Sequence, residues 1–247
     1  MIRRVLKDIR ETWPYWSVLI LVGFLVAVYR WQYLTKMSVA LLRMEVGIDW
    51  FSAYMISANY VGFLLIAAPL FGSEFKHHTM ARLLAQPISR CRVWWEKTLA
   101  FFMIAAMVLV CQGIAWGWIP WKLANMYPHY PWLLLDHLSK LLVWILLGFC
   151  VSAIAMATGF FTSLLLRQSH TAFWAALILL PVALLVWQFL DRILLFSILH
   201  FSLTDWIMTH SPSLFGSADG VFLLAFGVLW FCVIYPLGWL KFKNLEV

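Results

Sequence analysis

Residues 72–97 read GSEFKHHTMARLLAQPISRCRVWWEK and form a long polar insert between two apolar runs. The flanking runs, residues 50–71 and 98–119, match the length of about 20 residues that a helix needs to cross a bilayer. The insert holds five Lys or Arg residues against two Glu residues. A basic segment of this length is too costly to bury in hydrocarbon, so it is predicted to lie at a membrane face.

Four more apolar runs of spanning length are present, at residues 13–33, 138–166, 171–190 and 221–240. Apolar residues make up 64% of the 247 residues, and mean hydropathy is +0.87, which is too much hydrocarbon for a soluble core. The runs are continuous, whereas strands of a membrane barrel alternate in short segments. We therefore expect an all-α integral membrane protein with six transmembrane helices in a single domain, residues 1–247.

The distribution of Lys and Arg predicts the orientation. With the N-terminus in the cytoplasm, 12 basic residues fall on the inner side and 6 on the outer side. This excess favours both termini inside, which also places the insert in the cytoplasm. The net charge of +7 is then explained by anionic lipid headgroups, and no nucleic-acid partner is expected.

Two further regions accompany the six runs. The first 13 residues mix apolar side chains with Arg and Lys at helical spacing, which predicts an amphipathic interfacial helix or, compatibly, a positive flank that orients the first span. Residues 191–220 hold apolar pieces too short to span, broken by Pro212 and Gly216. They predict a re-entrant hairpin before the last span, or a helix that lies flat on the surface.

The insert itself contains a short amphipathic pattern. One face of a helix can gather Phe75, Thr79, Met80, Leu83 and Leu84. Pro87 is expected to end this helix, and Ser89 is expected to cap the helix that leads into the next span. An apolar ridge with basic flanks suits docking to another protein, and a connector lying on the headgroups is the alternative.

The insert also follows a longer pattern, E-x4-T-x3-LL-x2-P-x-SR, which ends near a Lys. The residues that carry it are Glu74, Thr79, Leu83, Leu84, Pro87, Ser89, Arg90 and Lys97. His78 stands where the usual pattern has Gly before the Thr. Together with six spans and an N-terminal amphipathic helix, this pattern resembles the ABC-2 family of transporter permeases.

The resemblance implies a permease subunit of an ATP-driven exporter in a bacterial plasma membrane, the cell inner membrane. It implies a homodimer or heterodimer of permease chains over two copies of a separate P-loop ATPase. Residues 74–86 would be the coupling helix, and the ATPase-coupling residues would be Glu74, Phe75, Thr79, Met80, Arg82, Leu83, Leu84, Pro87 and Arg90. The chain has no GxxxxGK[ST] loop, so no cofactor and no enzymatic activity are expected on it, and ATP and Mg²⁺ would bind the partner.

Three polar residues inside the predicted spans, Asn59, Gln112 and Gln188, are candidates for a transport path. Each is equally suited to hydrogen-bond a neighbouring helix. No predicted span carries a charge at its centre, which disfavours ion-coupled transport and favours a hydrophobic or amphiphilic substrate such as a lipid, peptide or drug. The seven histidines fall at span ends or in loops without a metal-ligand spacing, so no metal site is expected.

Two other classes of function compete with transport. A membrane anchor or sensory subunit of an ATPase complex would carry the same coupling helix. An intramembrane hydrolase is compatible with six spans, but the chain lacks GxSxG, and its histidines lie outside the predicted spans, which makes a Ser–His pair hard to build.

Overall fold

The computed structural model describes residues 2–34, 50–76, 80, 89–126, 132–189 and 218–245. These residues form no strand and seven helices, which are α1 (Ile2–Glu11), α2 (Trp13–Leu34), α4 (Trp50–Lys76), α6 (Arg90–Met126), α7 (Trp132–Leu166), α8 (Ser169–Phe189) and α11 (Ala218–Lys243). Five helices are long and apolar enough to cross a membrane, namely α2, α4, α6, α7 and α11, and Ser169–Ala183 of α8 is a shorter apolar stretch. The described chain is therefore all-helical and supports a multi-pass membrane protein, while six spans stay a prediction.

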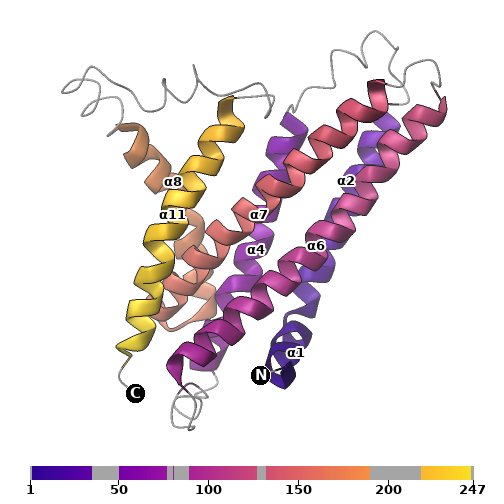
Figure 1. The fold of residues 1–247 in the computed structure, drawn as a ribbon. Helices are drawn as coiled ribbons and strands as arrows, with labels where there is room; N and C mark the ends of the chain where they lie inside the picture. The colour runs from indigo at the N-terminus through magenta and orange to yellow at the C-terminus, as the bar shows by residue number, and fades with distance from the viewer. Residues whose placement is uncertain are drawn as a thin grey trace.

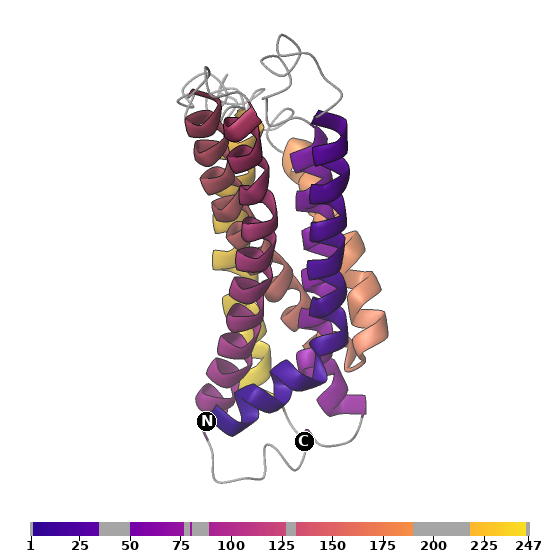
Figure 2. The same cartoon turned by 90° about the vertical axis from the view of Figure 1, so that its right-hand side faces the viewer.

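The long helices run up and down in one bundle (Figure 1). We call the lower end the end at which α4, α7 and α11 finish and α2, α6 and α8 begin; both marked termini lie there. Figure 2 shows α1 lying across this lower end, steeply inclined to α2. Helix α1 contacts α6, and two of its residues, Val5 and Asp8, are buried.

The helix bounds agree closely with the apolar runs at α2 and α8 and differ at the insert. The apolar runs were expected to end at residue 71 and to resume at residue 98, but α4 continues to Lys76, whereas the start of α6 at Arg90 agrees with the predicted cap at Ser89. Both extensions carry charged residues that sequence analysis had assigned to water, and Glu74, Glu96 and Lys97 are in fact buried. The cause is pairing between these charges, which is described below.

Helix α7 is at the centre of the bundle, in contact with α4, α6, α8 and α11. It packs closely on α4 because its facing residues are small: Gly159 lies against Ala67, and the Ser163 hydroxyl donates a hydrogen bond of 2.9 Å to the carbonyl oxygen of Ala68. Small residues and hydroxyl groups are the usual means by which helices associate in lipid, where no hydrophobic force joins them. The α4–α7 contact thus builds much of the core.

Two helix ends follow ordinary capping chemistry. The Ser89 hydroxyl accepts a hydrogen bond of 3.3 Å from the backbone N–H of Arg92, which confirms Ser89 as the N-cap of α6. Helix α7 ends before Arg167, whose φ of 55° is left-handed, and its N–H bonds the Ser163 carbonyl at 2.9 Å. The predicted re-entrant segment lies outside the described residues, except that 218–220 form the start of α11.

We predict that Gly159→Ala lowers the free energy of unfolding by about 1–3 kcal/mol, because a crowded core has to shift to admit the new atom. A Cβ at this position would lie 2.7 Å from the Cβ of Ala67, which cannot rotate away. Gly117→Ala is the control, since its Cβ would lie at an ordinary van der Waals distance, 3.5 Å, from its described neighbour Leu141 Cδ2. Thermal unfolding in detergent should separate the two variants, and equal midpoints would contradict the packing argument.

Candidate functional site

Three charged side chains from three helices meet at the lower end of the bundle. The Lys97 Nζ atom on α6 donates to Asp8 Oδ1 on α1 at 2.8 Å and to Glu74 Oε1 on α4 at 3.1 Å. All three side chains are buried, with exposed fractions of 6% for Lys97, 8% for Asp8 and 11% for Glu74. We call these residues the ion triad; it joins α1, α4 and α6 at one point.

Burial makes the ion triad sensitive to the loss of any partner. A charge removed from water costs several kcal/mol, and that cost is offset only by close opposite charges and hydrogen bonds. Burial raises the pKa of Asp8 above its ordinary value, and the neighbouring Lys97 ammonium group opposes that rise. Asp8 therefore takes up a proton at a higher pH than an exposed aspartate does.

A second ionic group lies beside the ion triad. Glu96, which is 4% exposed, accepts a hydrogen bond from Arg92 Nε at 3.2 Å and lies 3.7 Å from Arg4 Nη1. Arg4 is on α1 and Arg92 is on α6, so this group also ties α1 to the start of α6. The amphipathic helix predicted at the N-terminus is thus fastened to the bundle by its charges as well as by its apolar face.

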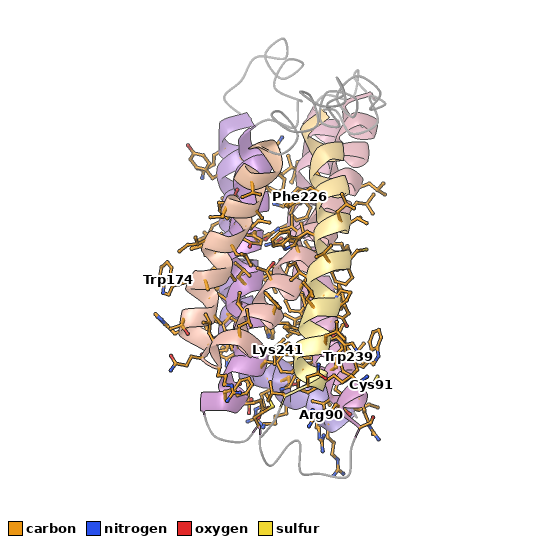
Figure 3. All side chains as sticks on the ribbon, turned by 90° about the vertical axis from the view of Figure 1, so that its left-hand side faces the viewer. Arg90, Cys91, Trp174, Phe226, Trp239 and Lys241 are labelled. Atoms are coloured by element: carbon orange, nitrogen blue, oxygen red, sulfur yellow. The ribbon has the colours of Figure 1, made fainter. Side chains whose placement is uncertain are left out.

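An aromatic cluster lies one helical turn from the ion triad. Trp94 on α6 is its centre, with ring centroids 5.5 Å from Phe71, 5.6 Å from Phe160 and 5.2 Å from Tyr235. Trp239 and Phe242 of α11 complete it. In Figure 3, Trp239 and Lys241 lie at the lower end of α11, near Arg90 and Cys91 of α6. The cluster joins α4, α6, α7 and α11 at the lower end of the bundle.

The predicted coupling residues are only partly described. Glu74 and Phe75 belong to the last turn of α4, Met80 is buried against the core, and the Arg90 guanidinium group donates a hydrogen bond to the Lys243 carbonyl oxygen. Phe75 is half-buried and packs on the same core. The remaining candidates, Thr79, Arg82, Leu83, Leu84 and Pro87, lie outside the described residues.

Two of the three path candidates bind each other. Asn59 Nδ2 donates to Gln112 Oε1 at 3.2 Å, and Gln112 Nε2 donates to Asn59 Oδ1 at 3.1 Å and to the Leu19 carbonyl oxygen at 3.1 Å. Gly23 leaves the space for Gln112, because a Cβ there would lie 2.5 Å from Gln112 Cγ. This amide pair links α2, α4 and α6 and confirms the interhelical alternative. A part in a transport path stays a prediction, and the side chain of Gln188 on α8 lies outside the described part.

Sequence reasoning missed Asp8 and did not foresee that Lys97 is buried. A usable signal was present, because Lys97 follows Trp94 and precedes Phe101 at helical spacing, on the face that packs into the core. A Lys on such a face requires a carboxylate partner. The partner could not be identified from the chain alone, because Asp8 lies 89 residues earlier.

Among the described residues no group of His, Cys, Asp and Glu has an arrangement suited to a metal ion. Comparison of the whole chain with protein-family models, curated proteins and solved structures gives no match. The arguments for function therefore rest on the residues and contacts of this chain.

We predict that Lys97→Met lowers the free energy of unfolding by about 3–5 kcal/mol, because it leaves the carboxylates of Asp8 and Glu74 buried without their cation. The neutral triple variant Asp8→Asn, Glu74→Gln, Lys97→Met should recover most of the loss. Thermal unfolding in detergent measures both. A Lys97→Met chain as stable as the wild type, or a triple variant no better than the single one, would contradict the ion triad.

The amide pair is best tested by a double-mutant cycle of Asn59→Leu and Gln112→Leu. Each single variant removes two reciprocal hydrogen bonds, whereas the double variant leaves no buried amide unpaired. We expect a coupling energy of about 0.6–1.7 kcal/mol, which lies between the average and the largest value for hydrogen bonds between membrane helices. Reversible unfolding in mixed micelles gives the four stabilities, and strict additivity would show that the pair contributes nothing.

Proposed function

We propose that the chain is the permease subunit of an ATP-driven transporter of the ABC-2 type, with six spans and both termini in the cytoplasm of a bacterial cell. In this proposal it exports a hydrophobic or amphiphilic substrate across the plasma membrane. The observation that carries the proposal is the contact between Glu74 and Lys97, which are the first and last residues of the pattern that resembles the family.

This contact closes the segment between α4 and α6 into a loop whose two ends touch. A force applied to residues 75–96 is therefore passed to α4 and α6 together, and Asp8 passes it to α1 as well. Ion pairs that join three helices in this way are suited to a segment that transmits the movement of a partner protein to the bundle. In an ATP-driven transporter, nucleotide binding by the partner would shift the helices between two packings through this link.

Two apolar side chains in residues 75–96 attach this segment to the bundle. Met80 is 4% exposed and Phe75 is half-buried, so both hold the segment against the bundle. Within the proposal, contact with the ATPase then falls to Thr79, Arg82, Leu83 and Leu84. The partners are two copies of a P-loop ATPase, which bind ATP and Mg²⁺, and a second permease chain, identical or different.

The rival functions differ in their support. An intramembrane hydrolase needs an activated Ser, but the Ser152 hydroxyl donates to a backbone carbonyl oxygen at 2.8 Å, and the Ser163 hydroxyl shares its proton between the carbonyl oxygens of Gly159 and Ala68 at 2.6 Å and 2.9 Å. These are bonds of structural serines in helices. An anchor or sensory subunit shares every feature of the segment with a permease, so it is separated from one by reconstitution with the ATPase and measurement of substrate movement.

The proposal predicts that the full chain, purified from its native membranes in mild detergent, carries a P-loop ATPase in equal molar amount and shows ATP hydrolysis. Leu83→Asp should lower the recovered ATPase at least about tenfold. A charge placed in an apolar interface is expected to weaken binding by more than about 1.4 kcal/mol, which is a factor of ten in affinity. Lys241→Glu is the matched control, because Lys241 is exposed at the same end of the bundle (Figure 3).

Native mass spectrometry and the hydrolysis rate are the two measurements. A chain that purifies without a P-loop protein would overturn the proposal. Equal ATPase recovery with Leu83→Asp and with wild type would also overturn the assigned contact.

A further inference from the structure

Two clefts lie next to each other on the side of the bundle formed by α2, α4 and α8. The first has a volume of about 470 Å³ and is lined mainly by polar residues of α1 and α4. The second has a volume of about 320 Å³ and is lined mainly by apolar residues of α4 and α8. Tyr15 and Pro69 line both clefts, so the polar cleft and the apolar cleft meet at these two side chains.

Acidic side chains outnumber basic ones among the described residues that line the polar cleft. Its walls include the carboxylates of Asp8, Glu11 and Glu74 together with the Lys7 ammonium group. Lys97 also binds Asp8 and Glu74, so among the described charged residues at this cleft three carboxylates stand against two ammonium groups. The Lys7–Glu11 pair is 3.5 Å apart and more than half exposed, which makes it weak and easily exchanged. A cationic group is therefore the complementary occupant of this cleft.

The apolar cleft has the form of a groove with an aromatic rim. Leu65 and Phe173 contribute to its walls, and Tyr15 and Trp174 remain 43% and 51% exposed. Figure 3 shows Trp174 pointing outward from α8. Beside the groove, α4 and α8 touch through their backbones, because a Cβ on Gly72 would lie 2.5 Å from the Cα of Ser169. The closely packed helices α4 and α8 thus form an apolar groove suited to a hydrocarbon chain.

We propose that the two clefts together bind one amphiphile with an amine head, its ammonium group in the polar cleft beside Glu11 and its hydrocarbon chain in the groove beside Phe173 and Trp174. Both volumes fall in the range of about 300–1,000 Å³ that is typical of small-molecule sites. The same chemistry is offered by an aminophospholipid and by a free long-chain amine. The role of this site as the place where a substrate enters the transporter rests on the proposed function. Binding of the amphiphile to the site does not require the ATPase.

The test uses the full chain in dodecyl maltoside, whose head group is uncharged. The protein is mixed with a long-chain primary amine that carries a diazirine in the middle of its hydrocarbon chain, and is then irradiated. Two control probes have the same hydrocarbon chain with a sulfate or a hydroxyl head group. Mass spectrometry locates the labelled peptide. We expect the amine to label the peptide of Phe173 and Trp174 about fivefold more than either other probe does, which corresponds to about 1 kcal/mol from one ion pair.

Three variants test whether the ammonium group binds in the polar cleft and the hydrocarbon chain in the apolar cleft. Glu11→Gln should lower amine labelling about fivefold through the loss of one ion pair, and His170→Trp, at an exposed position that lines the groove, should abolish it by filling the space. Lys7→Gln is the control with the opposite sign, because it removes a competing cation and should keep or raise labelling. Glu11, Lys7 and His170 are exposed, so the variants should elute as the wild type does.

Competition identifies the source of the amine. Loss of labelling with unlabelled phosphatidylethanolamine indicates a lipid, and loss only with dodecylamine indicates a free cationic amphiphile; both support the site. Equal labelling by all three head groups, or labelling unchanged in Glu11→Gln, would overturn it. A chain that binds the amine but purifies without an ATPase would keep this inference and overturn the proposed function, so the two fail separately.

Discussion

The buried Lys97 ammonium group is the contact on which the lower end of the bundle depends. It faces two carboxylates, on α1 and on α4, and therefore holds both helices against α6. Without it, two largely buried negative charges would remain without their cation, at a cost of several kcal/mol. The aromatic cluster around Trp94 adds an apolar layer one turn away and brings in α7 and α11. The lower end is therefore one connected unit of charge and aromatic packing.

The rest of the bundle is held by a different kind of contact. Because lipid is as apolar as the side chains, helices in a membrane associate through close packing and hydrogen bonds. Gly159 against Ala67, Ser163 against the Ala68 carbonyl, and Gln112 in the space left by Gly23 all belong to this kind. By contrast, α2 and α11 present many exposed apolar side chains, as helices in contact with lipid do. The lower end thus differs in chemistry from the spans above it.

Much of the fold could be predicted from the sequence, because apolar runs of spanning length are a strong signal. The prediction placed α2 at residues 13–33, against Trp13–Leu34 observed, and placed α8 at 171–190, against Ser169–Phe189. It ended the apolar run of α4 too early, because charged residues were taken to lie in water and only the folded chain shows Lys97 between its partners, whereas the start of α6 at Arg90 follows the predicted cap at Ser89. Asn59 and Gln112 were singled out correctly as costly polar residues, but their pairing depends on the register of two helices 53 residues apart in sequence.

Hydrogen exchange of the full chain in detergent tests the central claim most directly. If the ion triad fastens α1 and the end of α4 to α6, Lys97→Met should speed exchange of the backbone amides of α1 at least about tenfold, while α8 keeps its protection, since local opening follows the loss of local contacts. Arg92→Met, which removes an ion pair with a half-exposed arginine, is the control and should change α1 far less. Equal protection of α1 in wild type and Lys97→Met would contradict the claim that this buried lysine holds the lower end together.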